Sequence, residues 1–218
     1  MPNQTVVPPG GHFQLPADSQ ESLVAFRCSP AFRPYLEEDA RDAAVIIDTP
    51  IVYQYIQGAS PISLSSSGSD SSELLDVTIG IGASVFARKE VPLNTTGYEI
   101  SLDITSLKAQ ITGYNVTCNA TYGAETSLSS TNQQFSASTS LLYLPDTQGS
   151  VVKTDLRTGV LWARPADGKG GDFQPFISQG FYVSFDRALA QNLSYIDQLK
   201  ADGFNTVGSI SPLCCGRS

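Results

Sequence analysis

Short runs in which hydrophobic and polar residues alternate fill the chain from residue 22 to residue 164, and clusters of turn-forming residues separate them. A period of two is typical of strands that bury one face. We predict strands over residues 23–28, 44–48, 51–56, 74–87, 98–104, 112–122, 135–144, 150–155 and 159–163. Within 74–87, Gly80 and Gly82 indicate a bulge or a sharp bend. The pattern therefore predicts a mainly β region, folded as an antiparallel β-sandwich.

The periodicity changes after residue 164. Residues 165–178 begin with a Pro- and Gly-rich stretch and are expected to be a linker; they contain no Gly-Lys-Ser/Thr phosphate-binding sequence. Apolar residues then recur at helical spacing, and Gly203 is well placed to end the helix. These residues are Leu189, Leu193, Ile196 and Leu199. Apolar runs at 180–185 and 204–207 flank the helix, so we predict one strand–helix–strand unit over 179–207.

The expected organisation has five parts. Residues 1–20 form an irregular N-terminal segment, residues 21–164 the sandwich, and residues 165–178 the linker. Residues 179–207 form the strand–helix–strand unit, and residues 208–218 are a tail that continues no pattern.

Five Asn-x-Ser/Thr sequons begin at Asn3, Asn94, Asn115, Asn119 and Asn192. In the run 114–122, alternation puts Asn115 and Asn119 on the polar face of the predicted strand. Both asparagines are then expected to face solvent, where N-glycans can be attached. We predict glycosylation at Asn94, Asn115, Asn119 and Asn192; the alternative at the paired sequons is an ordinary polar strand face.

Two of the four cysteines, Cys28 and Cys118, lie in predicted strands. They form either a disulfide, which suits an oxidising compartment, or two buried free thiols. A bridge that closes so long a loop stabilises a protein by about 4–5 kcal/mol in the chain-entropy model. Cys214 and Cys215 are adjacent and match no zinc or redox pattern.

Hydroxyl groups rather than charges make this chain polar. The sequence has 27 serines and 16 threonines, whereas charged residues make up 16%, below the average of about 25%. With 13 basic and 21 acidic residues, the chain lacks the basic patch that nucleic-acid binding requires. A single histidine excludes a multi-histidine metal site, and no apolar run approaches the ~20 residues of a membrane span. We expect no nucleic-acid partner, no membrane span, no metal and no cofactor.

The first residues of the chain indicate a different cellular compartment from the sequons and the cysteine pair. Residues 1–9 have neither the basic start nor the apolar stretch of a secretory signal. Taken alone they indicate the cytosol, but the sequons and the cysteine pair indicate an extracellular protein. We expect a secreted protein whose signal peptide is absent from this chain.

Several segments resemble a known family. Residues 179–185 (Gln-Gly-Phe-Tyr-Val-Ser-Phe) and 193–207 resemble the opening of the (β/α)8 barrel in secreted, glycoside-hydrolase-like fungal proteins. Residues 156–159 and 48–51 resemble the N-terminal β-sandwich of those proteins. Residues 98–108 and 114–117 are similar to the jelly-roll accessory domains of sugar-cleaving enzymes. The resemblance implies a jelly-roll or immunoglobulin-like sandwich, followed by an incomplete barrel.

The resemblance also limits the expected chemistry. Barrel enzymes carry their catalytic groups at the C-terminal ends of several strands, and glycosidases need two carboxylates. This chain covers only the first strand or two, so it implies no catalytic residue and a missing barrel domain as partner. Asp186 follows the first barrel strand and, with Tyr182 and Trp162, is a candidate for contact with carbohydrate; core packing is the alternative for the two aromatic residues.

Other candidate sites are weaker. The acidic run Glu37-Glu38-Asp39 is either a Ca²⁺ site or a solvated turn. His12 lies in a Gly-rich segment and does not support a Ser-His-Asp triad. We expect an accessory fragment of a glycoside-hydrolase-like protein that is inactive on its own. A free-standing carbohydrate-binding module and a structural cell-wall glycoprotein remain the alternatives.

Overall fold

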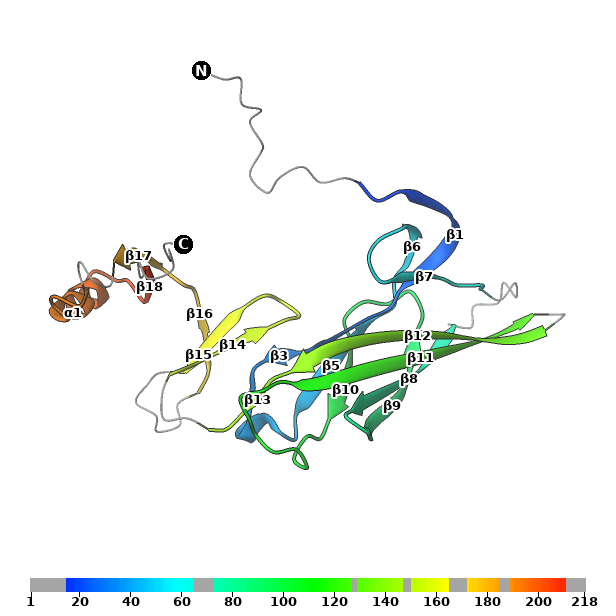
Figure 1. The fold of residues 1–218 in the computed structure, drawn as a ribbon, viewed down its shortest axis with the longest axis horizontal. Coiled ribbons are helices and arrows are strands. Elements are labelled where there is room, and N and C mark those ends of the chain that lie inside the picture. Colours follow the sequence, from blue (N-terminus) through cyan, green and yellow to red (C-terminus); the bar gives the residue numbers. More distant parts are fainter. Residues whose placement is uncertain are drawn as a thin grey trace, which may run out of the picture. The chain divides into compact units, whose positions relative to one another are not determined.

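The computed structural model describes residues 15–64, 73–126, 129–146, 150–164, 172–184 and 189–210 (Figure 1). This part of the chain is mainly β, with one α-helix and one 3₁₀ helix. The chain divides into two compact units, residues 1–172 and residues 173–218. The division lies inside the segment 165–178 that we expected to be a linker. In the described ranges no helix is long and apolar enough to cross a membrane.

Two antiparallel sheets form the centre of the first unit, in the orders β10-β5-β2 and β12-β11-β8-β9 (Figure 1). Their strands are β2 (Arg27–Pro30), β5 (Ala43–Asp48), β8 (Leu74–Ile81), β9 (Ser84–Pro92), β10 (Tyr98–Leu102), β11 (Tyr114–Thr126) and β12 (Ser129–Leu141). One hydrophobic cluster joins them, with Val45 and Ile100 from the first sheet and Val77 and Val116 from the second. Two sheets on a shared core are consistent with the predicted β-sandwich.

Shorter strands surround these sheets. The strand β1 (Asp18–Ala25) lies between β6 (Ile51–Gln54) and β7 (Ala59–Pro61). The strand β4 (Tyr35–Leu36) pairs with β13 (Tyr143–Leu144) and leads into the 3₁₀ helix η1 (Glu37–Asp39). The strand β14 (Val151–Asp155) pairs with β15 (Leu161–Arg164) on one side and with β3 (Phe32–Arg33) on the other.

The strand β5 is buried on both faces. Val45 and Ile47 point into the main core, whereas Ala44 and Ile46 form a second cluster with Ala31 and the partly buried Phe32. An uninterrupted apolar sequence, Ala-Ala-Val-Ile-Ile, is what a strand with two covered faces requires. The first unit therefore has a further layer outside the β10-β5-β2 sheet.

A disulfide joins the two sheets. Cys28 of β2 and Cys118 of β11 are bonded across 90 residues of sequence, with their Cα atoms 6.4 Å apart. The free-thiol alternative therefore does not apply to these two residues. In β11, Val116 and Cys118 are buried while Asn115 and Asn119 are exposed, as the alternation predicts.

The predicted run 74–87 differs most from the structure, because it forms a hairpin rather than one strand. The strands β8 and β9 are joined at Gly82, whose φ of 61° lies in the left-handed region that favours glycine. The pairing register also shifts between Ile79 and Gly80. The two glycines thus supply both of the features that the sequence offered as alternatives, a bulge and a sharp turn.

Other boundaries move by a few residues. The predicted strand 23–28 is interrupted between β1 and β2, and β1 begins at Asp18, inside the segment expected to be irregular. In the second unit, the strand β16 (Gln174–Phe176) lies in the predicted linker.

The second unit contains the predicted strand–helix–strand sequence. The strands β17 (Gly180–Ser184) and β18 (Thr206–Ile210) are parallel, and the helix α1 (Ser194–Ala201) lies between them in the chain. The helix begins at Ser194, later than predicted, where the side-chain oxygen of Asn192 accepts a hydrogen bond from the Ser194 N–H group. It ends as predicted at Gly203, whose φ is 91°.

Candidate functional site

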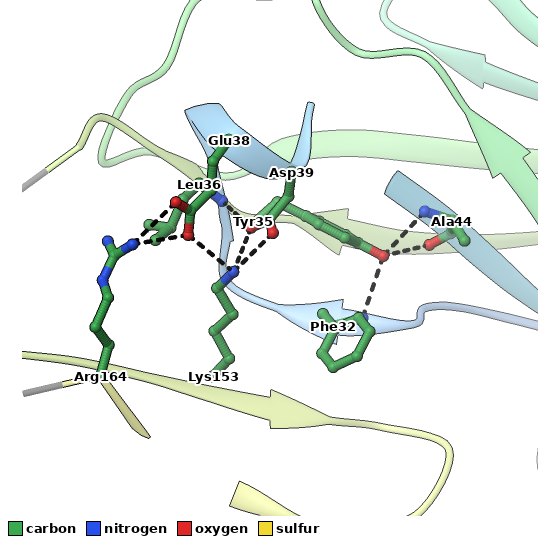
Figure 2. A network of polar contacts seen from close by, with 8 residues as sticks. All are labelled: Phe32, Tyr35, Leu36, Glu38, Asp39, Ala44, Lys153 and Arg164. Carbon is green, nitrogen blue, oxygen red and sulfur yellow. Dashed lines mark hydrogen bonds and ion pairs between the residues drawn. The ribbon is translucent and has the colours of Figure 1, made fainter. Parts of the chain in front are cut away.

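A buried tyrosine completes the edge of the central sheet. Pairing between β2 and β5 ends at Pro30, and the chain then turns so that Tyr35 points at the backbone of Ala44. The Tyr35 hydroxyl donates to the Ala44 carbonyl at 2.7 Å and accepts from the N–H groups of Ala44 at 3.0 Å and Phe32 at 3.2 Å (Figure 2). Burial raises the pKa of this phenol. The Ala44 carbonyl also accepts a hydrogen bond from the Ala31 N–H group at 2.9 Å. The hydroxyl therefore adds to the backbone pairing at that carbonyl and supplies the acceptor of the Ala44 N–H group.

The acidic run beside this tyrosine binds two basic side chains that are distant in the sequence. Lys153 of β14 donates to both carboxylate oxygens of Asp39, at 2.6 and 2.7 Å, and its side chain is only 7% exposed. Arg164 of β15 donates to both oxygens of Glu38, at 2.8 and 2.9 Å (Figure 2). Asp39 also accepts from the N–H group of Leu36 at 2.7 Å. This ion-pair network holds the β14–β15 hairpin against η1.

The ion pairs bear on both interpretations of the acidic run. The carboxylates of Glu38 and Asp39 are neutralised by Arg164 and Lys153, so neither is free to bind Ca²⁺. No group of three or more acidic, Cys or His side chains in the described residues could hold a metal ion. Glu37 and Glu38 are exposed, as the solvated-turn interpretation expects, whereas Asp39 is partly buried.

A second set of charges holds the turn end of the same hairpin. Arg157 donates to Asp155 at 2.9 Å and to Glu99 of β10 at 3.0 Å. Its guanidinium also lies 4.8 Å from the ring centroid of Phe32. The hydrogen bond from Arg157 holds the pKa of Asp155 below its ordinary value. Both groups of ion pairs position the hairpin, so we interpret them as structural.

The three predicted sugar-contact residues lie in different parts of the chain. Trp162 lies half-buried in β15 of the first unit, and its indole N–H group is buried without an acceptor in the described part of the chain. Tyr182 lies in β17 of the second unit and is 78% exposed. Tyr182 pairs with Gly208 of β18, and its ring lies close over this glycine. A Cβ atom at residue 208 would lie only 2.7 Å from the ring. Asp186 lies outside the described residues.

An exposed aromatic pair, which we did not predict, lies at the end of β6. Tyr53 is 57% exposed and Tyr55 is 60% exposed. Strand-like pairing continues to Tyr55, whose N–H group donates to Ala17 at 2.9 Å. Side chains two residues apart in a strand share a face. The sequence Tyr-Gln-Tyr within an apolar run was the signal that could have identified the pair.

The four predicted glycan acceptors are all exposed. Asn115 and Asn119 share the outer face of β11, as described above. Asn94 adopts a φ of 58°, and its side-chain oxygen accepts a hydrogen bond from the Ile51 N–H group at 3.1 Å. Asn3 lies outside the described residues. Exposure satisfies one requirement for N-glycosylation, which stays a prediction.

No family model, no curated protein and no solved structure matches this chain. The assignment of a function therefore depends on the sequence and on the geometry of the two units.

Proposed function

We propose that this chain is the N-terminal accessory region of a secreted, glycoside-hydrolase-like protein that acts on carbohydrate. In this proposal the first unit is a jelly-roll-like β-sandwich, and the second unit is the first part of a (β/α)8 barrel. The observation that carries the proposal is the parallel pair of β17 and β18. A helix in which no residue is buried connects the two strands.

Parallel strands occur almost only in sheets whose two faces are covered. In the second unit, large apolar side chains on or beside α1 are instead exposed: Leu193 by 64%, Tyr195 by 47% and Ile196 by 46%. Further strand–helix units of a barrel would bury this surface. The exposed apolar surface is therefore what we expect of a unit that is stabilised by packing against further strand–helix units.

The 218 residues alone are expected to lack hydrolase activity. A glycosidase needs two carboxylates on either side of the scissile bond. In the first unit three acidic residues form ion pairs with basic side chains: Glu38 with Arg164, Asp39 with Lys153 and Asp155 with Arg157. Barrel catalysis would instead require carboxylates at the ends of later strands.

The proposal is tested by reading the genomic sequence beyond the codon for Val207 and by producing the longer protein that it encodes. We expect further strand–helix repeats with paired acidic residues, and hydrolysis of glycosides by the longer protein but not by the 218-residue chain. Hydrolysis by the 218-residue chain, or a stop codon that leaves no further repeat, would count against the proposal.

Hydrogen exchange provides a second test on the existing chain. Amides of β17 and α1 should exchange faster than those of β5, because Leu189 is the one buried apolar residue among those whose burial is described in the second unit. The same amides should become protected in the longer protein. Equal protection of the two units in the 218-residue chain would argue that the second unit is complete.

A carbohydrate-binding module is the second candidate, and the exposed pair Tyr53 and Tyr55 favours it. Aromatic rings combine an apolar face with a polar end, which suits them to stack on sugar rings. The double variant Tyr53→Ala/Tyr55→Ala should then abolish binding on a glycan array. The control is Tyr195→Ala, which removes an exposed tyrosine from α1. Equal glycan binding by the native protein, the double variant and the control would exclude this surface as the sugar site.

A further inference from the structure

An open groove lies between the edges of the two central sheets. It has a volume of about 330 Å³ and is lined by Ala87, Arg88 and Lys89 of β9 and by Glu99, Ile100 and Ser101 of β10. This volume is near the lower limit of ligand sites, which is roughly 300 Å³. Each of the two strands is the outermost of its sheet. Outermost strands present unpaired N–H and C=O groups that another strand can bind.

Lys89 gives this groove an unbalanced positive charge. It pairs with Val77, whose side chain is fully buried, so both residues belong to the core-facing row of their strands. Lys89 is nevertheless exposed, because β9 is at the open edge of the sheets. Among the described residues its ammonium group has no carboxylate partner.

The other two charged residues of the groove form ion pairs. Arg88 forms a bidentate ion pair with Asp76, and Glu99 binds Arg157 at 3.0 Å. Arg157 is shared between Glu99 and Asp155. The three charged residues of the lining, Arg88, Lys89 and Glu99, sum to one positive charge, whereas the whole chain carries a formal net charge of −8. A segment that binds here would need a negative group opposite Lys89 and a backbone that can pair with a strand edge.

We propose that this groove binds an extended, acidic peptide segment of a partner protein by strand addition. Backbone groups of the peptide would bond to the free edge of β9 or β10, and a carboxylate would bind Lys89. Strand addition obtains its affinity from main-chain hydrogen bonds and its specificity from alternate side chains. The proposal concerns the first unit alone and does not depend on the carbohydrate function.

A charged residue that points inward from an edge strand also opposes pairing with other chains. Lys89 would disfavour a second copy that places its own Lys89 in the groove, whereas an acidic strand would be attracted. The two roles are compatible, and they predict that the partner is not another copy of this chain.

The test uses a fluorescent, terminally blocked peptide, Thr-Glu-Val-Glu-Val-Thr, and the full 218-residue protein. Fluorescence anisotropy should detect binding that weakens as the salt concentration rises from about 0.05 to about 0.5 M. Two matched peptides are needed. In one, lysine replaces both glutamates; in the other, the original sequence is N-methylated at alternate backbone amides, which removes donors but keeps the charges.

The variant Lys89→Glu should weaken binding of the acidic peptide by about three- to tenfold, which is the range of an exposed ion pair that is reversed. Lys108→Glu, which makes the same charge change outside the groove lining, should have a smaller effect. Amide shifts in an NMR spectrum should be concentrated in β9 and β10.

Four results would overturn the proposal. The first is equal binding of the N-methylated peptide, since it would show a purely electrostatic contact. The second is an equal loss of binding in Lys89→Glu and Lys108→Glu. The third is no binding of the acidic peptide at about 1 mM. The fourth is self-association of the protein through β9.

Discussion

At the scale of the residue, the most consequential interactions join side chains that are far apart in the sequence. Asp39 and Lys153 are separated by 114 positions, and nothing in the local pattern of either segment indicates the pair. The sequence identifies Glu37-Glu38-Asp39 as a cluster but not the cations that neutralise it, because only the packed hairpin brings them together. The sequence therefore predicted which acidic residues cluster, but not which basic residues neutralise them.

Lys153→Met is expected to destabilise the first unit by about 2–3 kcal/mol, since it leaves the partly buried Asp39 carboxylate without its charged donor. Trp162 is the only tryptophan of the chain and lies in the same hairpin, so urea unfolding can be followed by its fluorescence. Lys200→Met, on the exposed surface of α1, should change the stability by no more than about 0.5 kcal/mol. Equal effects of the two variants would contradict the structural role of Lys153.

Tyr35→Phe is expected to cost about 1–3 kcal/mol, because it removes the acceptor of the buried Ala44 N–H group. The ring itself is retained, so the loss reports on the hydrogen bonds rather than on packing. The matched control is Tyr195→Phe, which removes an exposed hydroxyl. A change of unfolding midpoint no larger than that of the control would mean that water or another group replaces the Tyr35 hydroxyl.

At the scale of the element, the period-two pattern predicted most strands to within a few residues, as for β5, β6 and β10. It failed where a glycine interrupts an apolar run. Residues 74–87 carry no polar turn sequence, and the left-handed conformation of Gly82 is what divides them into β8 and β9. A glycine permits a bulge, a turn or a plain strand, and tertiary pairing decides among these.

The link between β2 and β11 gives a prediction at this scale. Replacing both Cys28 and Cys118 by alanine should lower the free energy of unfolding by about 4–5 kcal/mol, as the chain-entropy model gives for a loop of this length. Urea unfolding of the variant and of the native protein provides the measurement. The matched control is Cys214→Ala/Cys215→Ala, which removes two thiols outside the described residues. A loss no greater than that of the control would show that the packed sheets alone fix the two strands.

At the scale of the whole molecule, the structure divides into two units, and the pattern of the sequence changes between them. The change from a period of two to helical spacing marks the second unit, whose parallel strands and helix are present in the structure. The pattern could not locate the division precisely, because residues 165–178 contain a short strand, β16, in a stretch rich in glycine and proline.

The stability of the whole fold should depend on pH in two ranges. The pKa of Asp155 is lowered by Arg157, so this pair stabilises the fold above the ordinary carboxyl value of about 4, and the stabilisation is lost as the pH falls through the lower, folded-state pKa. Burial raises the pKa of Tyr35, so its contribution is complete below about pH 10 and is lost as the pH rises through the raised value. We expect constant urea midpoints between about pH 5 and pH 9.

Substitution isolates the part of the acid range that is due to Asp155. Asp155→Asn should be less stable than the native protein at neutral pH and should lose less stability on acidification, since the titrating carboxylate is gone. Asp42→Asn, at an exposed aspartate, should keep the native acid profile. The interpretation fails if Asp155→Asn and the native protein lose stability in parallel below about pH 4.

The outer cover of β5 determines how short a fragment of this protein can be and still fold. Phe32 covers the side of β5 formed by Ala44 and Ile46, and Phe32 is itself held by Arg157 and by the pairing of β3 with β14. A protease that cuts before Val151 would remove this support and expose the second face of the central strand. The smallest autonomous fragment of the first unit therefore ends after Arg164, some twenty residues beyond the last strand of the two central sheets.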